Sequence, residues 1–339
     1  LDMRCLQDPG YARRGIGRHT LALLRHAPPG LALEGLVDPG LPPLIEEARA
    51  LLAVVHPNAH AAAVKAPDLF VSLSPMTHDP FFSARLLADE RVRRAAVVYD
   101  FIPWREPGRY LPGAADRLNY ALLLRWLARN DLFAPISRAA ANDLIDLLRV
   151  PEGAVTVTGA PVDDLFAGAA SARADRQPRH LLVVGGADAR KNPEVVIRAH
   201  ARSAALQAAN VPLVVGGNYD AGAADAFRAM ARDCGGCAEL VEVPGHVSEA
   251  ALLDSYVRAY AIVCPSRNEG FSRPVVEGMA AGLPCLASDI PAQRELVQDP
   301  ALRFAPDDDA SLTPMLERAV ADAAWRAAVV AEQGGIWPR

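Results

Sequence analysis

Two glutamates eight positions apart, Glu269 and Glu277, are the residues of this chain best suited to bind a hydroxyl-rich ligand. Glu269 lies in a polar loop. Glu277 lies in an expected helix that begins near Pro274, because proline fits the first turn of a helix, where its missing N–H would have no partner. Ser272 is the expected N-cap. Carboxylates accept hydrogen bonds from sugar or ribose hydroxyls, and a helix N-terminus attracts anions. The alternative makes Glu269 a turn residue and Glu277 a partner of the helix dipole, but the flanking glycines, prolines and Phe271 favour a ligand site.

A second candidate site follows the expected strand 180–184, where the turn Gly185–Gly186 leads to Arg190 and Lys191. Glycine lets a backbone approach a ligand closely. An arginine fork together with a compact ammonium group can neutralise a diphosphate without a metal. The alternative is a surface turn with two solvated cations. We favour phosphate binding, because the turn joins a buried strand to a helix.

Two weaker signals concern glycine and histidine. Gly15 and Gly17 form an expected loop before the first helix, but Thr20 breaks the G-x-G-x-x-G pattern of dinucleotide sites. The functional and structural interpretations of this loop stay open. His246 follows a strand end and could line a cleft, although a histidine without a ligand is favoured.

The sequence does not predict a metal site. The acidic run 307–309 is interpreted as a solvated turn beyond the last strand. Cys234 and Cys237 form a C-x-x-C pattern, but neither a second pair nor a histidine cluster accompanies them, so zinc binding and redox chemistry are disfavoured.

The elements that must position these residues alternate regularly along the chain. Short, nearly continuous apolar runs predict strands buried on both faces, as in a parallel sheet, and longer helical segments follow them. We expect strands at 68–71, 95–99, 131–134, 155–158, 180–184, 212–215, 239–243, 261–264 and 284–287, and helices at 17–26, 116–129, 139–148, 193–209, 223–233, 248–259, 274–281 and 312–330. This alternation predicts an α/β fold of two doubly wound, Rossmann-like domains with parallel sheets.

An irregular stretch, 161–178, separates the two halves. We expect an N-terminal domain of residues 1–165 and a C-terminal domain of residues 166–339. In open α/β sheets, ligands bind outside the carboxyl ends of the strands. The cleft between two facing sheets is therefore the expected site.

Composition excludes several classes of protein. The 339 residues are 51% apolar and 22% charged, which is typical of a folded chain with two cores. A net charge of −5 argues against a generally basic nucleic-acid binder. No apolar run approaches the ~20 residues of a spanning helix, and five scattered cysteines suit a reducing cytoplasm. The start at Leu1 resembles neither a signal peptide nor an initiation site, so we expect a few residues to be missing upstream.

Together these residues resemble glycosyltransferase family 4, whose members are retaining enzymes of the GT-B fold. The resemblance covers nearly the whole chain and is strongest to bacterial O-antigen and exopolysaccharide mannosyl- and rhamnosyltransferases. It is carried by the segments 269–282, 190–192, 15–18, 98–103 and 136–139, which read EGFSRPVVEGMAAG, RKN, GIGR, VYDFIP and ISRA.

The resemblance implies a role for each candidate residue. Glu269 would hold hydroxyls of the donor sugar, Glu277 would hold the donor ribose, and Asp100 would lie near the reacting sugar on the acceptor side. Glu269 and Asp100 are therefore the catalytic candidates. The other candidates for donor binding are Gly15, Gly17, Gly186, Arg190, Lys191, His246, Gly270, Phe271 and Ser272.

The chain departs from the family pattern at three places. Gly185 stands where many relatives carry arginine, Tyr99 stands where many carry histidine, and Ser272–Arg273 stands where many have Gly-Leu. These departures bear on the identity of the donor sugar more than on the type of reaction. The family's final helix, which crosses back to the first domain, is expected to be absent after residue 339.

The predicted function is a metal-independent, cofactor-free, retaining transfer of a hexose from a nucleotide sugar, with mannose from GDP-mannose favoured. The acceptor would be a saccharide or a lipid-linked saccharide in bacterial polysaccharide synthesis. Because Glu269 would hold hydroxyls, we expect front-face substitution, in which the departing phosphate oxygen takes the acceptor's proton. The alternatives are a nucleotide-sugar 2-epimerase and a nucleotide-sugar-binding protein without turnover, whereas the missing glycine fingerprint disfavours a nicotinamide oxidoreductase.

The predicted location is the cytoplasm. The amphipathic segment 116–132 could rest on the inner face of the cell membrane, although packing against its own domain is favoured. No nucleic-acid partner is expected.

Overall fold

The computed structural model describes residues 1–59, 68–162, 164–166 and 168–334. The chain divides into two compact units, Leu1–Pro161 and Val162–Arg339. This division lies close to the predicted boundary after residue 165. Both units are built from helices and parallel strands, as the alternating pattern predicts.

The C-terminal unit is built on one six-stranded sheet, in which neighbouring strands pair in parallel in the order β11-β10-β9-β6-β7-β8. Two of these strands, β7 and β10, are buried along their whole length, which explains the apolar runs in the sequence. β8 is shorter than predicted, and β11 is a two-residue strand that no pattern predicted. The bounds are β6 (His180–Val184), β7 (Leu213–Gly216), β8 (Val241–Glu242), β9 (Ala259–Cys264), β10 (Cys285–Ser288) and β11 (Arg303–Phe304).

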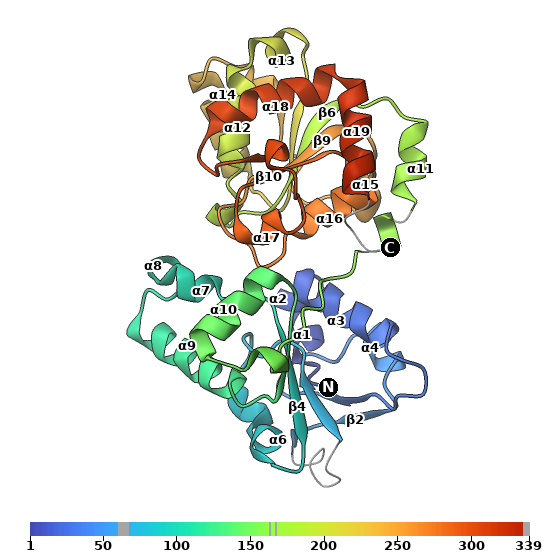
Figure 1. Cartoon of the computed structure of the whole chain (residues 1–339), viewed down its shortest axis with the longest axis vertical. Coiled ribbons are helices and arrows are strands. Elements are labelled where there is room, and N and C mark those ends of the chain that lie inside the picture. Colours follow the sequence, from blue (N-terminus) through green and yellow to red (C-terminus); the bar gives the residue numbers. More distant parts are fainter. Residues whose placement is uncertain (60–67, 163, 167, 335–339) are drawn as a thin grey trace. The chain divides into compact units, whose positions relative to one another are not determined.

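Helices cover both faces of this sheet (Figure 1). α12, α14 and α18 pack together on one face, while α15 and α16 pack against β9 from the other. The helices of this unit are α11 (Ala169–Ala174), α12 (Pro193–Arg202), α13 (Ala204–Ala208), α14 (Ala221–Asp233), α15 (Glu249–Val257), α16 (Arg273–Ala280), α17 (Pro291–Arg294), α18 (Asp309–Ala321) and α19 (Ala323–Gln333).

Two predicted helices, 193–209 and 312–330, are each broken in two. The side chain of Ser203 accepts a hydrogen bond from the N–H of Leu206 and caps α13, and the side chain of Asp322 accepts one from the N–H of Trp325 and caps α19. Serine and aspartate stabilise helix starts in this way, so each residue ends one helix and begins the next.

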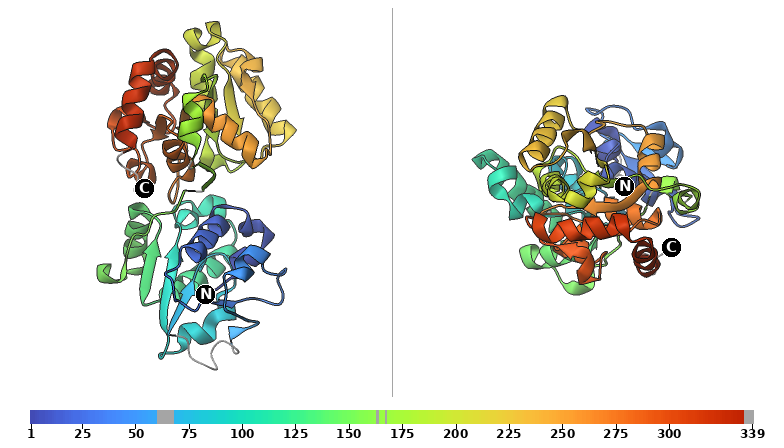
Figure 2. Two further views of the ribbon diagram at one scale, coloured as in Figure 1. Left: turned by 90° about the vertical axis from the view of Figure 1, so that its right-hand side faces the viewer. Right: turned by 90° about the horizontal axis from the view of Figure 1, so that it is seen from above.

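The N-terminal unit contains a three-stranded parallel sheet of β3 (Leu69–Ser72), β4 (Arg93–Val98) and β5 (Leu132–Pro135), which lie side by side in the left view of Figure 2. A second pair, β1 (Glu34–Leu36) and β2 (Val54–His56), is also parallel. The first residues of the chain lie between the two sheets. The N–H of Met3 donates to the carbonyl of Leu36, and the N–H of Asp2 donates to the carbonyl of Val71.

The predicted strand 155–158 is wrong as a regular strand. Only an isolated bridge joins Val155 to Phe133. The N–H groups of Thr156 and Thr158 donate to the carbonyls of Phe133 and Pro135, so the segment runs along the edge of β5 without forming a full ladder.

Helices of the N-terminal unit pack on both sides of β4 (Figure 1). On one side, α9 and α10 cover an apolar core that includes Phe101, Leu127, Phe133 and Leu144. None of the helices in the described residues has both the length and the apolar character that crossing a bilayer requires. The helices are α1 (Arg4–Gln7), α2 (Pro9–Ala12), α3 (Gly15–Arg25), α4 (Glu46–Ala50), α6 (Ala84–Ala88), α7 (Ile102–Arg105), α8 (Pro107–Tyr110), α9 (Ala114–Leu127) and α10 (Arg138–Leu148).

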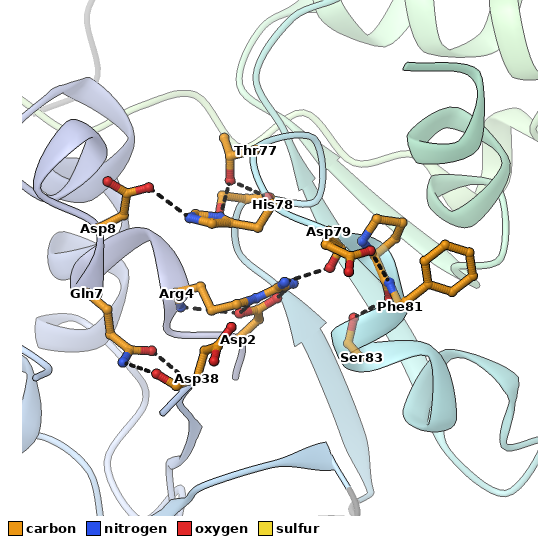
Figure 3. Close-up of polar contacts among 12 residues, drawn as sticks. Asp2, Arg4, Gln7, Asp8, Asp38, Thr77, His78, Asp79, Phe81 and Ser83 are labelled. Carbon is orange, nitrogen blue, oxygen red and sulfur yellow. Dashed lines mark hydrogen bonds and ion pairs between the residues drawn. The ribbon is translucent and has the colours of Figure 1, made fainter. Parts of the chain in front are cut away.

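A buried ion pair ties the start of the chain to the segment after β3 (Figure 3). Arg4 Nη2 lies 2.7 Å from Asp2 Oδ2, and the two side chains are 5% and 3% exposed. Arg4 Nη1 also donates to the carbonyl of Asp79 at 2.6 Å. Nearby, His78 Nε2 lies 3.3 Å from Asp8 Oδ2. These contacts hold the first residues of the chain against the segment that follows β3.

Candidate active site

The candidate site forms where β6 and β9, which are neighbours in the sheet, end at the same edge. The turn after β6 carries Arg190 and Lys191, and the loop after β9 carries Glu269. Several hydrogen bonds join these segments. The N–H of Arg267 donates to the carbonyl of Arg190 at 2.7 Å, and Asn192 Nδ2 donates to the carbonyl of Pro265 at 3.1 Å. The sheet thus brings together two loops that are far apart in the sequence.

The carboxylate of Glu269 is the centre of this site. It accepts hydrogen bonds from Arg190 Nη1 at 2.7 Å, from Lys191 Nζ at 2.5 Å and from Ser266 Oγ at 2.7 Å. Its side chain is 8% exposed. Burial by itself would raise the pKa of Glu269, but the charges of Lys191 and Arg190 and the hydrogen bonds from Lys191 and Ser266 lower it to about 2. Glu269 is therefore a firmly ionised group held by two cations.

The guanidinium of Arg190 is fixed by further contacts. Its Nε lies 3.1 Å from Asp188 Oδ2, and its Nη1 also donates to the carbonyl of Asn268 at 3.1 Å. Asp188 in addition accepts a hydrogen bond from the N–H of Arg190. Because Nε and Nη1 are both held, the positive charge has a set position at the edge of the sheet.

The second glutamate of the pair, Glu277, is the fifth of the eight residues of α16 and is 7% exposed. The hydroxyl of Tyr256 donates to its Oε2 at 2.8 Å, and Arg273 Nε lies 3.5 Å from its Oε1. Burial and the negative charges of Glu269 and Glu277 raise the pKa of the thiol of Cys264, the last residue of β9. The charges of both carboxylates therefore affect the same group, the thiol of Cys264 at the end of β9.

Ser272 has the predicted position before α16 but not the predicted role. Its side chain makes no capping hydrogen bond to the helix, and its backbone is left-handed, with φ 78° and ψ 68°. The Oγ atom instead accepts a hydrogen bond from Gln293 Nε2 at 3.0 Å. The start of the helix is as predicted, with Pro274 in its first turn. The capping prediction is wrong because the left-handed turn directs the side chain away from the helix.

The glycines of the C-terminal unit differ in their surroundings. A Cβ at Gly186 would meet nothing within 4 Å, so the backbone there is open to a ligand, whereas a Cβ at Gly185 would lie 3.2 Å from the hydroxyl of Tyr219. Gly270 is buried, and Phe271 is 7% exposed. His246 is exposed in the segment between β8 and α15, and its contribution to donor binding stays a prediction.

The glycine pair of the N-terminal unit is not a loop. Gly15 and Gly17 lie in the first turn of α3, which starts two residues earlier than predicted. A Cβ at Gly17 would lie 2.2 Å from the carbonyl oxygen of Ala12 and 2.6 Å from that of Tyr11. Close packing of α3 on α2 therefore explains Gly17. Contacts of Gly15 and Gly17 with a donor stay predictions.

Asp100 follows β4 in the N-terminal unit and is half-buried. Its Oδ1 accepts a hydrogen bond from the N–H of Ile102 at 3.1 Å, which starts α7. The preceding residue, Tyr99, places its hydroxyl 3.1 Å from His19 Nδ1. Asp100 thus has a structural partner, and its role beside a reacting sugar stays a prediction.

The acidic run 307–309 serves helix and loop contacts. Asp307 Oδ1 lies 2.7 Å from Arg267 Nη2, Asp308 accepts a hydrogen bond from the N–H of Ser311 at the start of α18, and Asp309 pairs with Arg198 and Arg202. All five cysteines, including Cys234 and Cys237, are unpaired thiols.

Sequence reasoning missed several residues that hold the site together. Ser266 and Asn192 lie within the recognised motifs, and their polar side chains beside charged residues were a usable signal. Tyr256 and Gln293 each reach their partner from 21 positions away along the chain. No local pattern marks such residues, because only the packing of helices on the sheet brings them near the motif.

Comparison with known proteins identifies the unit that carries this site. Residues 169–331 match the family model described as glycosyl transferases group 1. The C-terminal unit belongs to the group 1 glycosyltransferases. The resemblance carried by Arg190, Lys191, Glu269 and Glu277 is thereby confirmed for the unit that contains all four.

Curated relatives of the chain include two enzymes named as mannosyltransferases. The serotype-specific mannosyltransferase WbdA of Escherichia coli is 25% identical over 281 residues, which cover 78% of this chain and 34% of WbdA. The O-antigen chain mannosyltransferase RfbU of Salmonella typhimurium is 46% identical over 56 residues, which cover 16% of each chain. The chain spans about a third of the length of the WbdA proteins it matches.

Solved structures of glycosyltransferases share the fold. HepE of Anabaena in complex with UDP matches with a TM-score of 0.73 at 14% identity, over 99% of this chain and 93% of HepE. Sucrose-phosphate synthase of Thermosynechococcus elongatus matches with a TM-score of 0.69 at 16% identity, over 99% of this chain and 92% of that enzyme. The predicted GT-B fold, with two Rossmann-like units, is therefore confirmed.

Proposed function

We propose that this protein is a retaining hexosyltransferase that moves mannose from GDP-mannose to a saccharide or lipid-linked saccharide acceptor in bacterial polysaccharide synthesis. The observation that carries the proposal is the buried carboxylate of Glu269, held by both Arg190 and Lys191. The names of WbdA and RfbU support mannose as the sugar. The UDP bound to HepE supports a nucleoside diphosphate as the leaving group.

In this proposal, Arg190 and Lys191 stabilise the charge that develops on the departing diphosphate. Cations whose positions are already set need little reorganisation during the reaction, which makes them effective in stabilising a transition state. The diphosphate takes hydrogen bonds that Glu269 accepts in its absence, and Glu269 then accepts hydrogen bonds from the sugar hydroxyls. Two cations balance the charge of the leaving group, so the proposed reaction needs no metal and no cofactor.

The stereochemistry follows from the state of Glu269. In the donor complex proposed here, the carboxylate of Glu269 accepts hydrogen bonds from the sugar hydroxyls, and a carboxylate held in this way is a weak nucleophile. The proposed step is therefore front-face substitution. The acceptor oxygen bonds to the anomeric carbon, the bond to the phosphate oxygen breaks, and the departing oxygen takes the acceptor's proton.

The test incubates the full chain with GDP-mannose and a mannoside acceptor in the presence of EDTA, with UDP-glucose as a parallel donor. The expected result is a glycoside with the anomeric configuration of the donor, read by NMR, and release of GDP. Donor consumption without an acceptor would indicate the epimerase, and binding without turnover would indicate a binding protein. A mannosyl adduct on Glu269 in the mass spectrum would contradict front-face substitution, and loss of activity in EDTA would contradict metal independence.

The acceptor proposal includes a location at the cytoplasmic face of the membrane, in peripheral contact with lipid. Helix α9 presents Arg117, Leu118 and Arg125 on its exposed side, and Leu118 is 65% exposed. Arginine beside an exposed apolar side chain suits an anionic lipid surface. Co-sedimentation with phosphatidylglycerol vesicles but not with phosphatidylcholine vesicles is expected, and L118S/R125S should lose it. Equal binding of the variant would contradict this part of the proposal.

A further inference from the structure

Ser272 has a backbone conformation that L-amino acids other than glycine rarely adopt. Its φ of 78° lies in the left-handed region, which costs a residue with a Cβ about 1–2 kcal/mol. Such strain persists only where surrounding contacts enforce it, and it is common at functional sites. The side chain of Ser272 makes no capping bond to α16, so its hydroxyl is available to a partner outside the loop.

Gln293 supplies that contact. Its Nε2 donates to Ser272 Oγ at 3.0 Å, and the two residues are 0% and 4% exposed. The backbone of Gln293 is also fixed, because its carbonyl accepts hydrogen bonds from the N–H groups of Leu296 and Val297. Within the part of the chain that the structure describes, the other amide atom, Oε1, is buried without a partner. A buried unpaired acceptor is costly, so the bond to Ser272 is the interaction of this amide that offsets the cost.

The hydrogen bond from Gln293 acts on Ser272, which lies between the two glutamates in the sequence. Ser272 lies between Glu269, three residues earlier, and Glu277, five residues later, and its carbonyl accepts the hydrogen bond of the N–H of Val275 at the start of α16. A change of its φ would turn the loop that carries Glu269 relative to the helix that carries Glu277. The left-handed turn therefore fixes how the two carboxylates are placed.

We infer that Gln293 is a positioning residue, which holds the left-handed turn at Ser272 and thereby the spacing of Glu269 and Glu277 for the nucleotide sugar. This inference rests on the proposed function for its substrate but not for its mechanism. One specific consequence follows. If the turn is made by glycine, which adopts a positive φ without strain, the bond from Gln293 is no longer needed.

The experiment compares Gln293→Met in two backgrounds, the natural chain and Ser272→Gly. Methionine keeps the length of the glutamine side chain but cannot donate a hydrogen bond. In the natural chain, Q293M should raise the KM for GDP-mannose about tenfold, because one buried hydrogen bond is lost. In the S272G background, the same change should alter KM less than about twofold, because no strained residue remains to be held.

A second measurement is independent of activity. Hydrogen exchange of the unliganded protein should become faster in the segment 266–280 with Q293M, whereas S272G/Q293M should exchange like S272G. If no nucleotide sugar is bound or turned over, the proposed transfer fails, but this measurement still decides the inference.

A matched control is Gln333→Met, which removes another buried glutamine of the same unit. Gln333 is 2% exposed and bonds to the backbone N–H and carbonyl of Cys285. Q333M should lower the thermal midpoint without changing KM or the exchange of 266–280.

An effect of Q293M that is equal in both backgrounds, or that is absent from both measurements in the natural chain, would overturn the inference.

Discussion

The hydroxyl of Tyr256, near the end of α15, donates a hydrogen bond to the carboxylate of Glu277 in α16, over a distance of 2.8 Å. Tyr256 is fully buried, and burial raises the pKa of its hydroxyl well above the ordinary value, so the group keeps its proton and stays a donor. One oxygen of Glu277 is therefore held from inside the unit. The hydrogen bond links α15, which carries no predicted site residue, to Glu277 in α16.

Tyr256→Phe should weaken binding of a nucleoside diphosphate. The change keeps the ring and removes the donor, which leaves a buried carboxylate oxygen without its partner and costs about 1–2 kcal/mol. Calorimetric titration with GDP should give a dissociation constant raised roughly tenfold. Tyr120→Phe is the matched control, because the hydroxyl of Tyr120 is buried without a hydrogen-bond partner in the described residues. Equal affinities of Y256F and Y120F would rule out this role for Tyr256.

Lys191→Met should reduce catalysis strongly. Lys191 Nζ provides one of the two charges on Glu269 and, in the proposed reaction, one of the two on the diphosphate. Loss of such a group lowers kcat/KM by about a hundredfold or more. The measurement is initial velocity with GDP-mannose over a range of concentrations. The control variant is Arg202→Met, which removes a cation that pairs with Asp309. This change should leave the rate of the reaction unchanged. Wild-type kcat/KM in K191M would contradict the assignment.

The stability of the protein should depend on Glu269 in acid. Its pKa is lowered from 4.5 to about 2, so the folded state holds the ionised form more tightly than the unfolded state does. The stabilisation of about 3 kcal/mol is complete above the unfolded value and is lost as the pH falls through the folded value. Urea unfolding between pH 6 and pH 3 should therefore show a steeper loss for the natural chain than for E269Q. Parallel curves for the natural chain and E269Q would show that the pKa of Glu269 is not lowered.

Arg4→Met should destabilise the N-terminal unit. It leaves the carboxylate of Asp2 buried without its cation, which costs about 3–5 kcal/mol. Asp2→Asn combined with Arg4→Met should recover part of this loss, because the remaining group is neutral. Thermal unfolding provides the measurement. Arg91→Met, which removes the cation of an exposed pair with Asp89, should leave the midpoint unchanged. A midpoint of R4M equal to that of R91M would show that the buried pair contributes nothing.

The parts of the fold that the sequence predicts best are those buried on two faces. The runs at 180–184, 212–215 and 261–264 all become central strands, since continuous apolar runs arise where helices cover both sides. The prediction fails at the edges. Val155 to Thr158 has the β-branched composition of a strand but pairs only partly with β5, and the two-residue β11 carries too few positions for a pattern.

The candidate site likewise has features that the sequence indicates and features that it does not. Spacing and residue type singled out Glu269, Arg190 and Lys191, and the structure brings these three side chains together where β6 and β9 end. Their part in donor binding stays a prediction. The left-handed turn at Ser272 and the contact of Gly17 with α2 were not predictable. The first depends on a glutamine in α17, and the second depends on how closely two helices approach. Both are properties of packing, which a local pattern does not carry.

Arg190, Lys191, Glu269 and Glu277 all come from a single six-stranded sheet and the segments at its edge. The ion pairs that the structure shows for Glu269 and Glu277 therefore lie within Val162–Arg339. A recombined gene that exchanges the first half for that of another such enzyme would keep this electrostatic arrangement. Under the proposed function, such an exchange would alter the choice of acceptor while the groups that stabilise the leaving diphosphate stayed the same.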